Sequence, residues 1–317
     1  NRFRPCFCTW IFAKLNCHIN FKNKRGRKIM ALSYESTRGG QKGVTASQAI
    51  LKGLAEDGGL FMPTEIPKLD KTLEQLAGMT YQETAYEVMK LFLTDYTEEE
   101  LKSCIANAYD DKFDTEEIAP LAKADGAYFL ELYHGSTIAF KDMALSILPH
   151  LMTTAAKKNH ADKEIVILTA TSGDTGSAVA NGFLGVDGIH VYVLYPKGKV
   201  SEIQEKQFTT LGQNITALEV DGTFDDCQAL VKSAFMDKEL NEHMQLTSAN
   251  SINVARFLPQ AFYYFYAYAQ LKKAGKADNA VICVPSGNFG NITAGLFGKK
   301  MGLPVKRFIA ANNKNDI

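Results

Sequence analysis

Short apolar runs rich in β-branched and aromatic residues recur through the second half of the chain and limit the folds it can adopt. They are separated by helical stretches, mostly at a spacing of about 25–30 residues, and are Glu164–Thr169, Ile189–Leu194, Ile215–Val220, Ala280–Val284 and Val305–Ala310. Near-continuous apolar character predicts strands buried on both faces, as in a mainly parallel sheet. Ligands of such sheets bind in the turns at the carboxyl ends of the strands. We therefore expect an α/β fold with mainly parallel sheets, whose strand-to-helix turns lie on one sheet and form the site.

The segment from Met30 to about Gly126 has helical signals instead. Apolar residues at helical spacing predict a helix over Ser47–Glu56, stopped by Gly58 and Gly59. Two capping boxes, Thr80 with Glu83 and Thr97 with Glu100, each open a further helix. We expect three parts: a head over 1–29, a small and mostly helical N-terminal domain over 30–126, and an α/β domain over 127–317 that is incomplete at its C-terminus.

Charge and cysteine usage narrow the class of protein. The chain has 317 residues with 35 basic and 35 acidic side chains, but eight of the basic ones and none of the acidic ones lie in residues 1–30. The remainder is therefore acidic, which gives no reason to expect nucleic-acid binding. No apolar run approaches the length of a membrane span, and the six cysteines form no metal or disulfide pattern. We expect a cytoplasmic protein without a metal site, whose head is translated upstream sequence or, alternatively, a basic arm.

Lys141 lies in the run His134-Gly-Ser-Thr-Ile-Ala-Phe-Lys-Asp142, directly after the apolar stretch Tyr128–Tyr133. This pattern predicts a strand, a short turn and a lysine at the mouth of the next helix. A lysine held there and partly desolvated has a lowered pKa, and its neutral amine can attack an aldehyde. The alternative is a solvated lysine at a helix start.

A second turn, Thr169–Gly176, follows the strand that ends near Leu168. Two glycines allow close approach of the backbone, and three hydroxyl residues lie at a helix N-terminus, which together suit a carboxylate or phosphate. The acidic Asp174 would repel an anion unless it faces elsewhere. The candidate residues are Thr171, Ser172, Gly173, Asp174 and Thr175. The alternative is a helix cap with tight packing on the sheet.

The third turn, Pro285–Ile292, again connects a strand to a helix. Its successive N–H groups are expected to form a nest for a phosphate dianion. It matches neither the dinucleotide fingerprint nor the nucleoside-triphosphate loop. The candidate residues are Gly287, Asn288, Phe289, Gly290 and Asn291. Three such turns, one of which carries a lysine, suggest a phosphorylated aldehyde cofactor.

A fourth segment, Thr247–Arg256, leads into an aromatic helix predicted over Phe257–Leu271. It is dense in anion-binding groups, and an arginine can hold a phosphate with two parallel hydrogen bonds. The candidate residues are Ser248, Asn250, Ser251, Asn253 and Arg256. The alternative is a capped helix with Arg256 on its solvated side. The aromatic stripe Phe262–Tyr266 is expected to be core packing.

Together these runs resemble threonine synthase, a family of pyridoxal-phosphate enzymes with the tryptophan-synthase-β-like fold (fold type II). The resemblance covers about Met30 to the end, in the order of the family. The matching runs are Gly58–Pro63, His134–Asp142, Thr171–Gly176, Ser248–Asn253 with Arg256, and Ser286–Asn291.

The resemblance implies that Lys141 forms the internal aldimine with pyridoxal 5'-phosphate, that Gly287–Asn291 hold the cofactor phosphate, and that Ser248–Arg256 hold the phosphate of O-phosphohomoserine. The implied reaction is γ-elimination of phosphate followed by addition of water at the β-carbon, with Lys141 as the acid and base. Related proteins carry Asn where this chain has Asp174. The family also continues beyond the point equivalent to Ile317, where the partner of the pyridine nitrogen is found.

Two other functions remain open at this point. One is another enzyme of the same fold, such as an amino-acid dehydratase or a cysteine synthase. The other is a truncated protein that binds the cofactor or a phosphate without turnover. We expect poor solubility and little turnover from the 317-residue chain, because Val305–Ala310 is predicted to be a buried strand with few residues after it.

Overall fold

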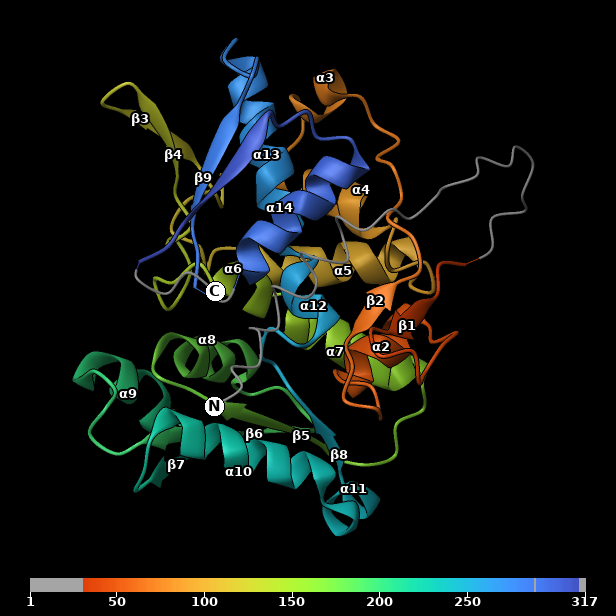
Figure 1. Cartoon of the computed structure of the whole chain (residues 1–317), viewed down its shortest axis with the longest axis vertical. Helices are drawn as coiled ribbons and strands as arrows, with labels where there is room; N and C mark the ends of the chain where they lie inside the picture. Colours follow the sequence, from red (N-terminus) through yellow and green to blue (C-terminus); the bar gives the residue numbers. More distant parts are fainter. Residues whose placement is uncertain (1–30, 288, 314–317) are drawn as a thin grey trace.

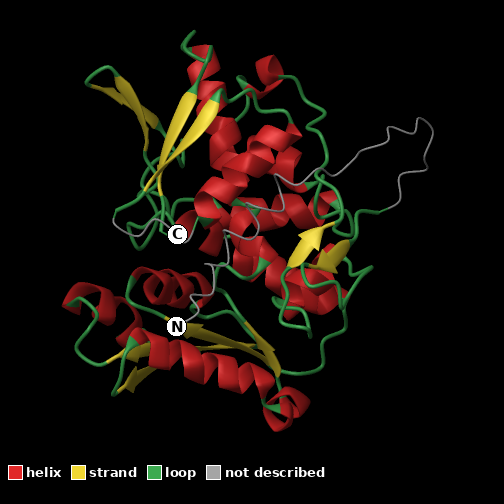
Figure 2. Cartoon of the chain, in the orientation of Figure 1, coloured by secondary structure: helices red, strands yellow, loops and turns green. Residues whose placement is uncertain are grey.

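The computed structural model describes residues 31–287 and 289–313, so the expectations for the head lie outside the described residues. A four-stranded sheet with its helices forms one layer of the molecule, and a larger, mostly helical body packs on it (Figure 1). Figure 2 shows that the short remaining strands lie at the margins of this helical body. In the described part of the chain, no helix combines the length and the apolarity that a membrane span requires.

The four-stranded sheet contains three of the predicted strands. Its strands are all parallel and run in the order β7-β6-β5-β8, with β5 Ile165–Ala170, β6 Ile189–Pro196, β7 Ile215–Val220 and β8 Gln245–Thr247. Helix α8 (Asp174–Phe183) lies on one face and α10 (Phe224–Met236) on the other, while α9 (Glu202–Thr209) packs beside α8 and α11 (Lys238–His243) beside β8 (Figure 1). This alternation of strand and helix is the parallel α/β architecture expected from the apolar runs.

The expectation that the three turns lie on one sheet is wrong. Strands β9 (Val281–Pro285) and β10 (Arg307–Ala311) form a separate parallel pair, and β4 (Ala127–Leu130) pairs antiparallel with β3 (Leu121–Ala124). An apolar run indicates a strand, but its pairing partner is decided by long-range packing. The expected domain boundary after residue 126 falls in the turn of the β3–β4 hairpin, and it stays a prediction.

Three of the predicted strands are not buried on both faces, contrary to the expectation. Leu218 of β7 is 43% exposed, Val281 of β9 43% and Ile309 of β10 42%. β7 is an edge strand, and the β9–β10 pair has no third strand among the described residues. An edge position leaves part of an apolar strand open to water, whatever its sequence pattern indicates.

The N-terminal helices confirm both capping boxes. Thr80 caps α4 (Tyr81–Met89) with Glu83, and Thr97 caps α5 (Glu98–Ala108) with Glu100. Helix α2 (Ala46–Lys52) ends at Gly53, earlier than predicted, because Gly53 takes a φ of 69° that glycine tolerates best. The remaining elements of this region are β1 (Tyr34–Ser36), β2 (Phe61–Pro63) and α3 (Leu73–Leu76), with β1 antiparallel to β2.

The helical body has its core around the aromatic helix α13. The predicted helix over Phe257–Leu271 is divided into α12 (Val254–Phe257) and α13 (Gln260–Lys273), with Pro259 at the break. The stripe Phe262–Tyr266 is buried, which confirms its role in packing. Helices α6 (Asp142–Leu145), α7 (Leu148–Lys158) and α14 (Gly290–Met301) complete this body.

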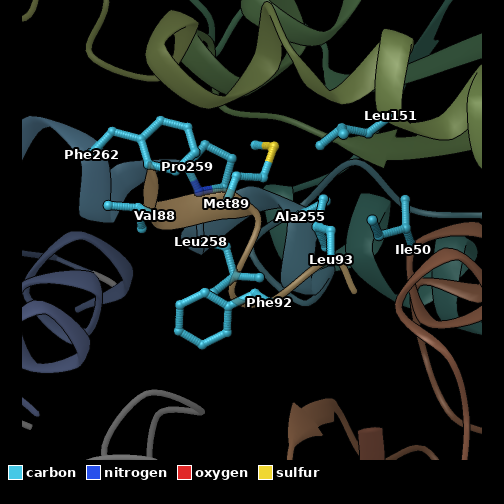
Figure 3. A pocket seen from close by; sticks show the side chains of 10 residues that line it. All are labelled: Ile50, Val88, Met89, Phe92, Leu93, Leu151, Ala255, Leu258, Pro259 and Phe262. Carbon is cyan, nitrogen blue, oxygen red and sulfur yellow. The ribbon is translucent and has the colours of Figure 1, made fainter. Parts of the chain in front are cut away.

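One small cavity lies inside this core. Side chains from α2, α4, α7, α12 and α13 point into it, among them Ile50, Met89, Leu151 and Phe262 (Figure 3). The side chains that line it are apolar, and none of them belongs to a candidate site residue. This cavity is therefore a packing defect of the core, and the candidate site residues lie elsewhere, in the turns between strands and helices.

Candidate active site

Lys141 and Asp174 form the centre of the candidate site. Lys141 directly precedes α6, and its Nζ lies 3.0 Å from Oδ2 of Asp174, the first residue of α8. The lysine side chain is 22% exposed, so it is largely enclosed but reachable. The negative charge of Asp174 is therefore paired with the positive charge of Lys141. This pairing explains how an acidic residue can occupy a turn that was predicted to bind an anion.

A buried carboxylate, Asp142, fixes the backbone turn next to Lys141. Its oxygens accept hydrogen bonds from the Thr137 backbone N–H at 2.8 Å and from the Thr137 hydroxyl at 2.6 Å. Burial raises the pKa of Asp142, and the hydrogen bonds from Thr137 oppose that rise. A Cβ added to Gly135 would lie 2.6 Å from the Cβ of Asp142, so the turn closes only with glycine there.

His134 anchors the start of the same turn, a role that the sequence reasoning missed. Its two ring nitrogens contact one carboxylate each, Nδ1 that of Asp114 and Nε2 that of Glu131 at 3.0 Å. The backbone N–H of Asp114 also donates to the His134 carbonyl at 3.0 Å. These contacts tie the Lys141 turn to the segment before β3. Asp114 lies 20 residues from His134 in sequence, so no local pattern indicated this contact, whereas Glu131 lies only three residues away.

In the second turn, the Thr171 side chain stabilises the loop by hydrogen bonds to its backbone. Its buried hydroxyl accepts from the backbone N–H groups of Gly173 at 3.0 Å and Gly176 at 2.8 Å. Ser172 is exposed and Thr175 is half-buried. The first-turn N–H groups of Asp174 and Thr175 have no partner within the helix by α-helical geometry. Donors of this turn that remain for a ligand are therefore Ser172, Thr175 and these two amides.

The third turn has the open geometry of an anion nest. Phe289 takes a φ of 58°, and the glycines on either side leave space, since a Cβ on Gly287 would meet nothing within 4 Å. A Cβ on Gly290 would meet only Ser251, at 4.0 Å, so this turn lies beside the fourth segment. The side chain of Asn291 binds the Pro285 carbonyl, which leaves only its backbone N–H for a ligand. Asn288 lies outside the described residues.

The fourth segment is tied to the second turn and to the N-terminal region. Asn250 accepts a hydrogen bond from the Thr169 hydroxyl at the end of β5, at 2.6 Å. The Ser248 hydroxyl accepts from the backbone N–H of Asn250 at 3.1 Å. Asn253 is fully buried and its side-chain amide donates to the carbonyls of Ile50 and Ser248. Ser251 is exposed, so it is the residue of this segment most open to a ligand.

Arg256 is a buried cation and not a solvated one. It is only 4% exposed, and its Nη1 donates to the Ala249 carbonyl. Among the described residues its Nε has no hydrogen-bond partner. Burial lowers the pKa of Arg256 to about 10, while the charge of Asp142 opposes this. A buried guanidinium with a free donor is suited to an anion that enters from the site.

Helix packing gathers the four segments. Helix α6 contacts α8 and α12, and α12 contacts α14, so the helices that start after these turns converge (Figure 1). Lys141 and Asp174 touch, as do the turns at Gly290 and Ser251. The arrangement combines a primary amine, the N-termini of two helices longer than two turns and a buried guanidinium. It is chemically suited to a ligand with an electrophilic carbonyl and phosphate groups.

Comparisons with known proteins agree with this chemistry. The family described as threonine synthase N terminus matches residues 33–109, and the family described as pyridoxal-phosphate dependent enzyme matches residues 114–316. The threonine synthase of Haemophilus influenzae is 47% identical over 275 residues, 86% of this chain and 62% of the relative. That of Schizosaccharomyces pombe is 43% identical over 297 residues, 90% of this chain and 58% of the relative.

Solved structures give the same result. The crystal structure of threonine synthase from Brucella melitensis with bound pyridoxal phosphate superposes with a TM-score of 0.81 at 40% identity, over 90% of this chain and 61% of that one. Threonine synthase from Escherichia coli superposes with a TM-score of 0.79 at 42% identity, over 90% of this chain and 64% of that one. The chain thus spans about three fifths of the length of these relatives. The match of more than half of the chain to the second family shows that it belongs to the pyridoxal-phosphate dependent enzymes, and its N-terminal region matches the family described as threonine synthase N terminus.

Proposed function

We propose that this chain carries the cofactor site and the phosphate-binding part of the substrate site of a threonine synthase. The enzyme would convert O-phosphohomoserine and water into threonine and phosphate. The observation that carries the proposal is the Lys141 amine, held against Asp174 at the junction of α6 and α8. This junction lies in the region of the chain that matches the pyridoxal-phosphate dependent enzymes.

The residues present fit the cofactor. The turn at Gly287–Asn291 offers glycine positions open to space and a left-handed residue at Phe289, which turn backbone N–H groups outward for a phosphate. Lys141 supplies the amine that would hold the aldehyde. When bound, pyridoxal phosphate withdraws electrons from the substrate carbon through its ring.

The residues of the chain would then divide the remaining work. Lys141 moves protons at Cα and Cβ of the substrate. Asp174 orients the Nζ atom of Lys141, which lies 3.0 Å from its Oδ2 atom. Ser172, Thr175 and the first amides of α8 bind the substrate carboxylate at a helix N-terminus. Arg256, whose buried Nε has no hydrogen-bond partner among the described residues, balances the charge of the substrate phosphate. In this proposal Asn253, Ser248 and Asn250 act indirectly, because their hydrogen bonds hold the segment that contains Ser251.

The reaction is tested by measuring two products from one incubation. A protein that combines this chain with the remaining part of its relatives' length is expected, with pyridoxal phosphate and O-phosphohomoserine, to release phosphate and form threonine in equal amounts, and its Lys141→Ala variant is expected to form neither. An amino-acid dehydratase would instead form a 2-oxo acid and ammonia from threonine or serine. Ammonia without phosphate release would therefore replace this proposal with the alternative enzyme of the same fold. Cofactor binding with no product would indicate a protein that binds without turnover.

We also propose a reducing, cytoplasmic setting for this activity. It is supported by the described cysteines Cys104, Cys227 and Cys283, which are free thiols. Labelling of these thiols in protein isolated under alkylating conditions tests it, since oxidised cysteines would contradict a reducing compartment.

A further inference from the structure

Gln204 contacts Asp174 of the Lys141–Asp174 pair, although it belongs to the segment that follows a different strand of the sheet. It belongs to α9, which follows β6, and its Nε2 donates a hydrogen bond to Oδ1 of Asp174. The other oxygen of this carboxylate, Oδ2, contacts Nζ of Lys141 at 3.0 Å. Asp174 is therefore held from both sides, by a neutral donor on one oxygen and by the lysine on the other.

The orientation of the Gln204 amide is determined by the Asp174 carboxylate and is compatible with its second contact. Its Oε1 accepts a hydrogen bond from the Ser201 hydroxyl at 3.1 Å. A carboxylate only accepts hydrogen bonds, so the atom that faces Asp174 must be the NH₂ group. The Ser201 hydroxyl, at the start of α9, then donates to the Oε1 atom that this orientation leaves on the other side of the amide.

The backbone under Gln204 is anchored to α8 as well. The hydroxyl of Ser177 donates to the Gln204 carbonyl at 3.2 Å, and Asn181 donates to the Gln207 carbonyl at 3.2 Å. A Cβ built on Gly173 would lie 2.1 Å from Oε1 of Gln204, and Gly173 has a φ of 142°. Gln204 therefore occupies the space that a side chain at position 173 would need, which gives a second reason for glycine there.

We propose that Gln204 is a positioning residue of the lysine site. Its amide holds the Asp174 carboxylate in one rotamer, so that the free oxygen directs the Lys141 amine to one place. A free carboxylate on the first turn of a helix would rotate among several rotamers, and its lysine partner would move with it. Among the described residues the Gln204 side chain forms hydrogen bonds with Asp174 and Ser201 and none with Lys141, so we infer that it acts through Asp174.

This inference rests on the proposed role of Lys141, and the experiment separates the two. Purified protein freed of cofactor is mixed with pyridoxal phosphate, and the growth of visible absorbance gives the attachment rate and the Kd. Borohydride reduction and peptide mapping then locate the attachment. If the wild-type chain forms no adduct at Lys141, the proposed function fails and the inference fails with it.

Given attachment in the wild type, Gln204→Leu is expected to weaken cofactor binding and slow attachment by about tenfold, the usual effect of one hydrogen bond to a charged group. Gln204→Glu places a second carboxylate against Asp174 and is expected to have a larger effect. The matched control is Gln207→Glu on the same helix, where the described structure shows no side-chain hydrogen bond, and it is expected to match the wild type. Equal rates for Gln204→Leu and the wild type overturn the inference.

A double-variant cycle separates positioning through Asp174 from a general effect on the fold. In an Asp174→Ala background, Gln204→Leu is expected to have less than a twofold effect, because the carboxylate it positions is gone. Circular dichroism and the melting temperature of each variant check that the fold is kept. If Gln204→Leu slows attachment by the same factor with and without Asp174, Gln204 does not act through the carboxylate and the inference is wrong.

Discussion

Replacement of Asn253 by alanine is predicted to destabilise the protein without any ligand being present. Its side chain is fully buried and joins two helix ends. The Oδ1 atom accepts from the Ala255 N–H at 3.0 Å and caps α12, and Nδ2 donates to the Ile50 carbonyl at 2.9 Å in α2. The same Nδ2 donates a longer bond of 3.3 Å to the Ser248 carbonyl. One side chain therefore satisfies backbone groups that both helices leave without partners.

The size of the effect follows from the groups that Asn253→Ala leaves unpaired. One N–H and two carbonyls lose their partner in a region that excludes water, at about 1–3 kcal/mol for each buried group and less for the long bond. The loss of an N-cap alone costs about 0.5–2 kcal/mol. We expect the free energy of unfolding to fall by about 3–5 kcal/mol, a large part of the roughly 5–15 kcal/mol typical of a folded domain.

Urea unfolding followed by circular dichroism, with no cofactor or substrate present, measures this change. Asn253→Asp keeps the capping oxygen but turns a second oxygen toward two carbonyls, so it is expected to be no better than alanine. Asn250→Ala is the matched control, because this half-buried side chain accepts a single hydrogen bond from the residues described, that of Thr169, and a loss of about 1 kcal/mol is expected. If Asn253→Ala unfolds like the wild type and only substrate binding weakens, Asn253 is a ligand contact and the reasoning above is wrong.

Three further predictions concern the site and its supports. Lys141→Ala is expected to leave no borohydride-stable adduct with pyridoxal phosphate, and an adduct of unchanged yield would exclude Lys141 as the attachment point. Arg256→Leu is expected to weaken the binding of O-phosphohomoserine by about 2–5 kcal/mol while cofactor affinity, measured by absorbance titration, stays the same, and a selective loss of cofactor instead would exchange the two phosphate sites. For His134, burial lowers the pKa, but the contacts with Glu131 and Asp114 outweigh burial and raise it above 6.5. A raised pKa in the folded state means that the stabilisation is fully present below about pH 6.5 and is lost as the pH rises through the folded-state value. The melting temperature of the wild type should therefore exceed that of His134→Gln at pH 5.5 by more than at pH 9, and a constant difference would contradict the ion pairs.

The features that the sequence alone determined are local ones. The capping boxes at Thr80 and Thr97 were predicted correctly, because a cap and its partner lie three residues apart and need no other part of the fold. The strands at β5, β6, β7 and β9 were placed within a residue or two, since near-continuous apolar runs and the glycine turns after them are recognised from neighbouring residues in the chain. The glycine-rich turns and Lys141 were recognisable for the same reason.

The tertiary structure alone decided how these parts meet. It placed β9 and β10 in a sheet of their own, buried Arg256, and used Asn253 to join two helix ends. It also brought Gln204 of α9 to Asp174 of α8, a contact between residues 30 positions apart. Burial and hydrogen-bond partners depend on which distant segments pack together, and a side chain such as asparagine or glutamine serves equally well at a cap, in a core or toward a ligand. The sequence pattern therefore indicates which chemical groups are available, while long-range packing determines which of them face the site.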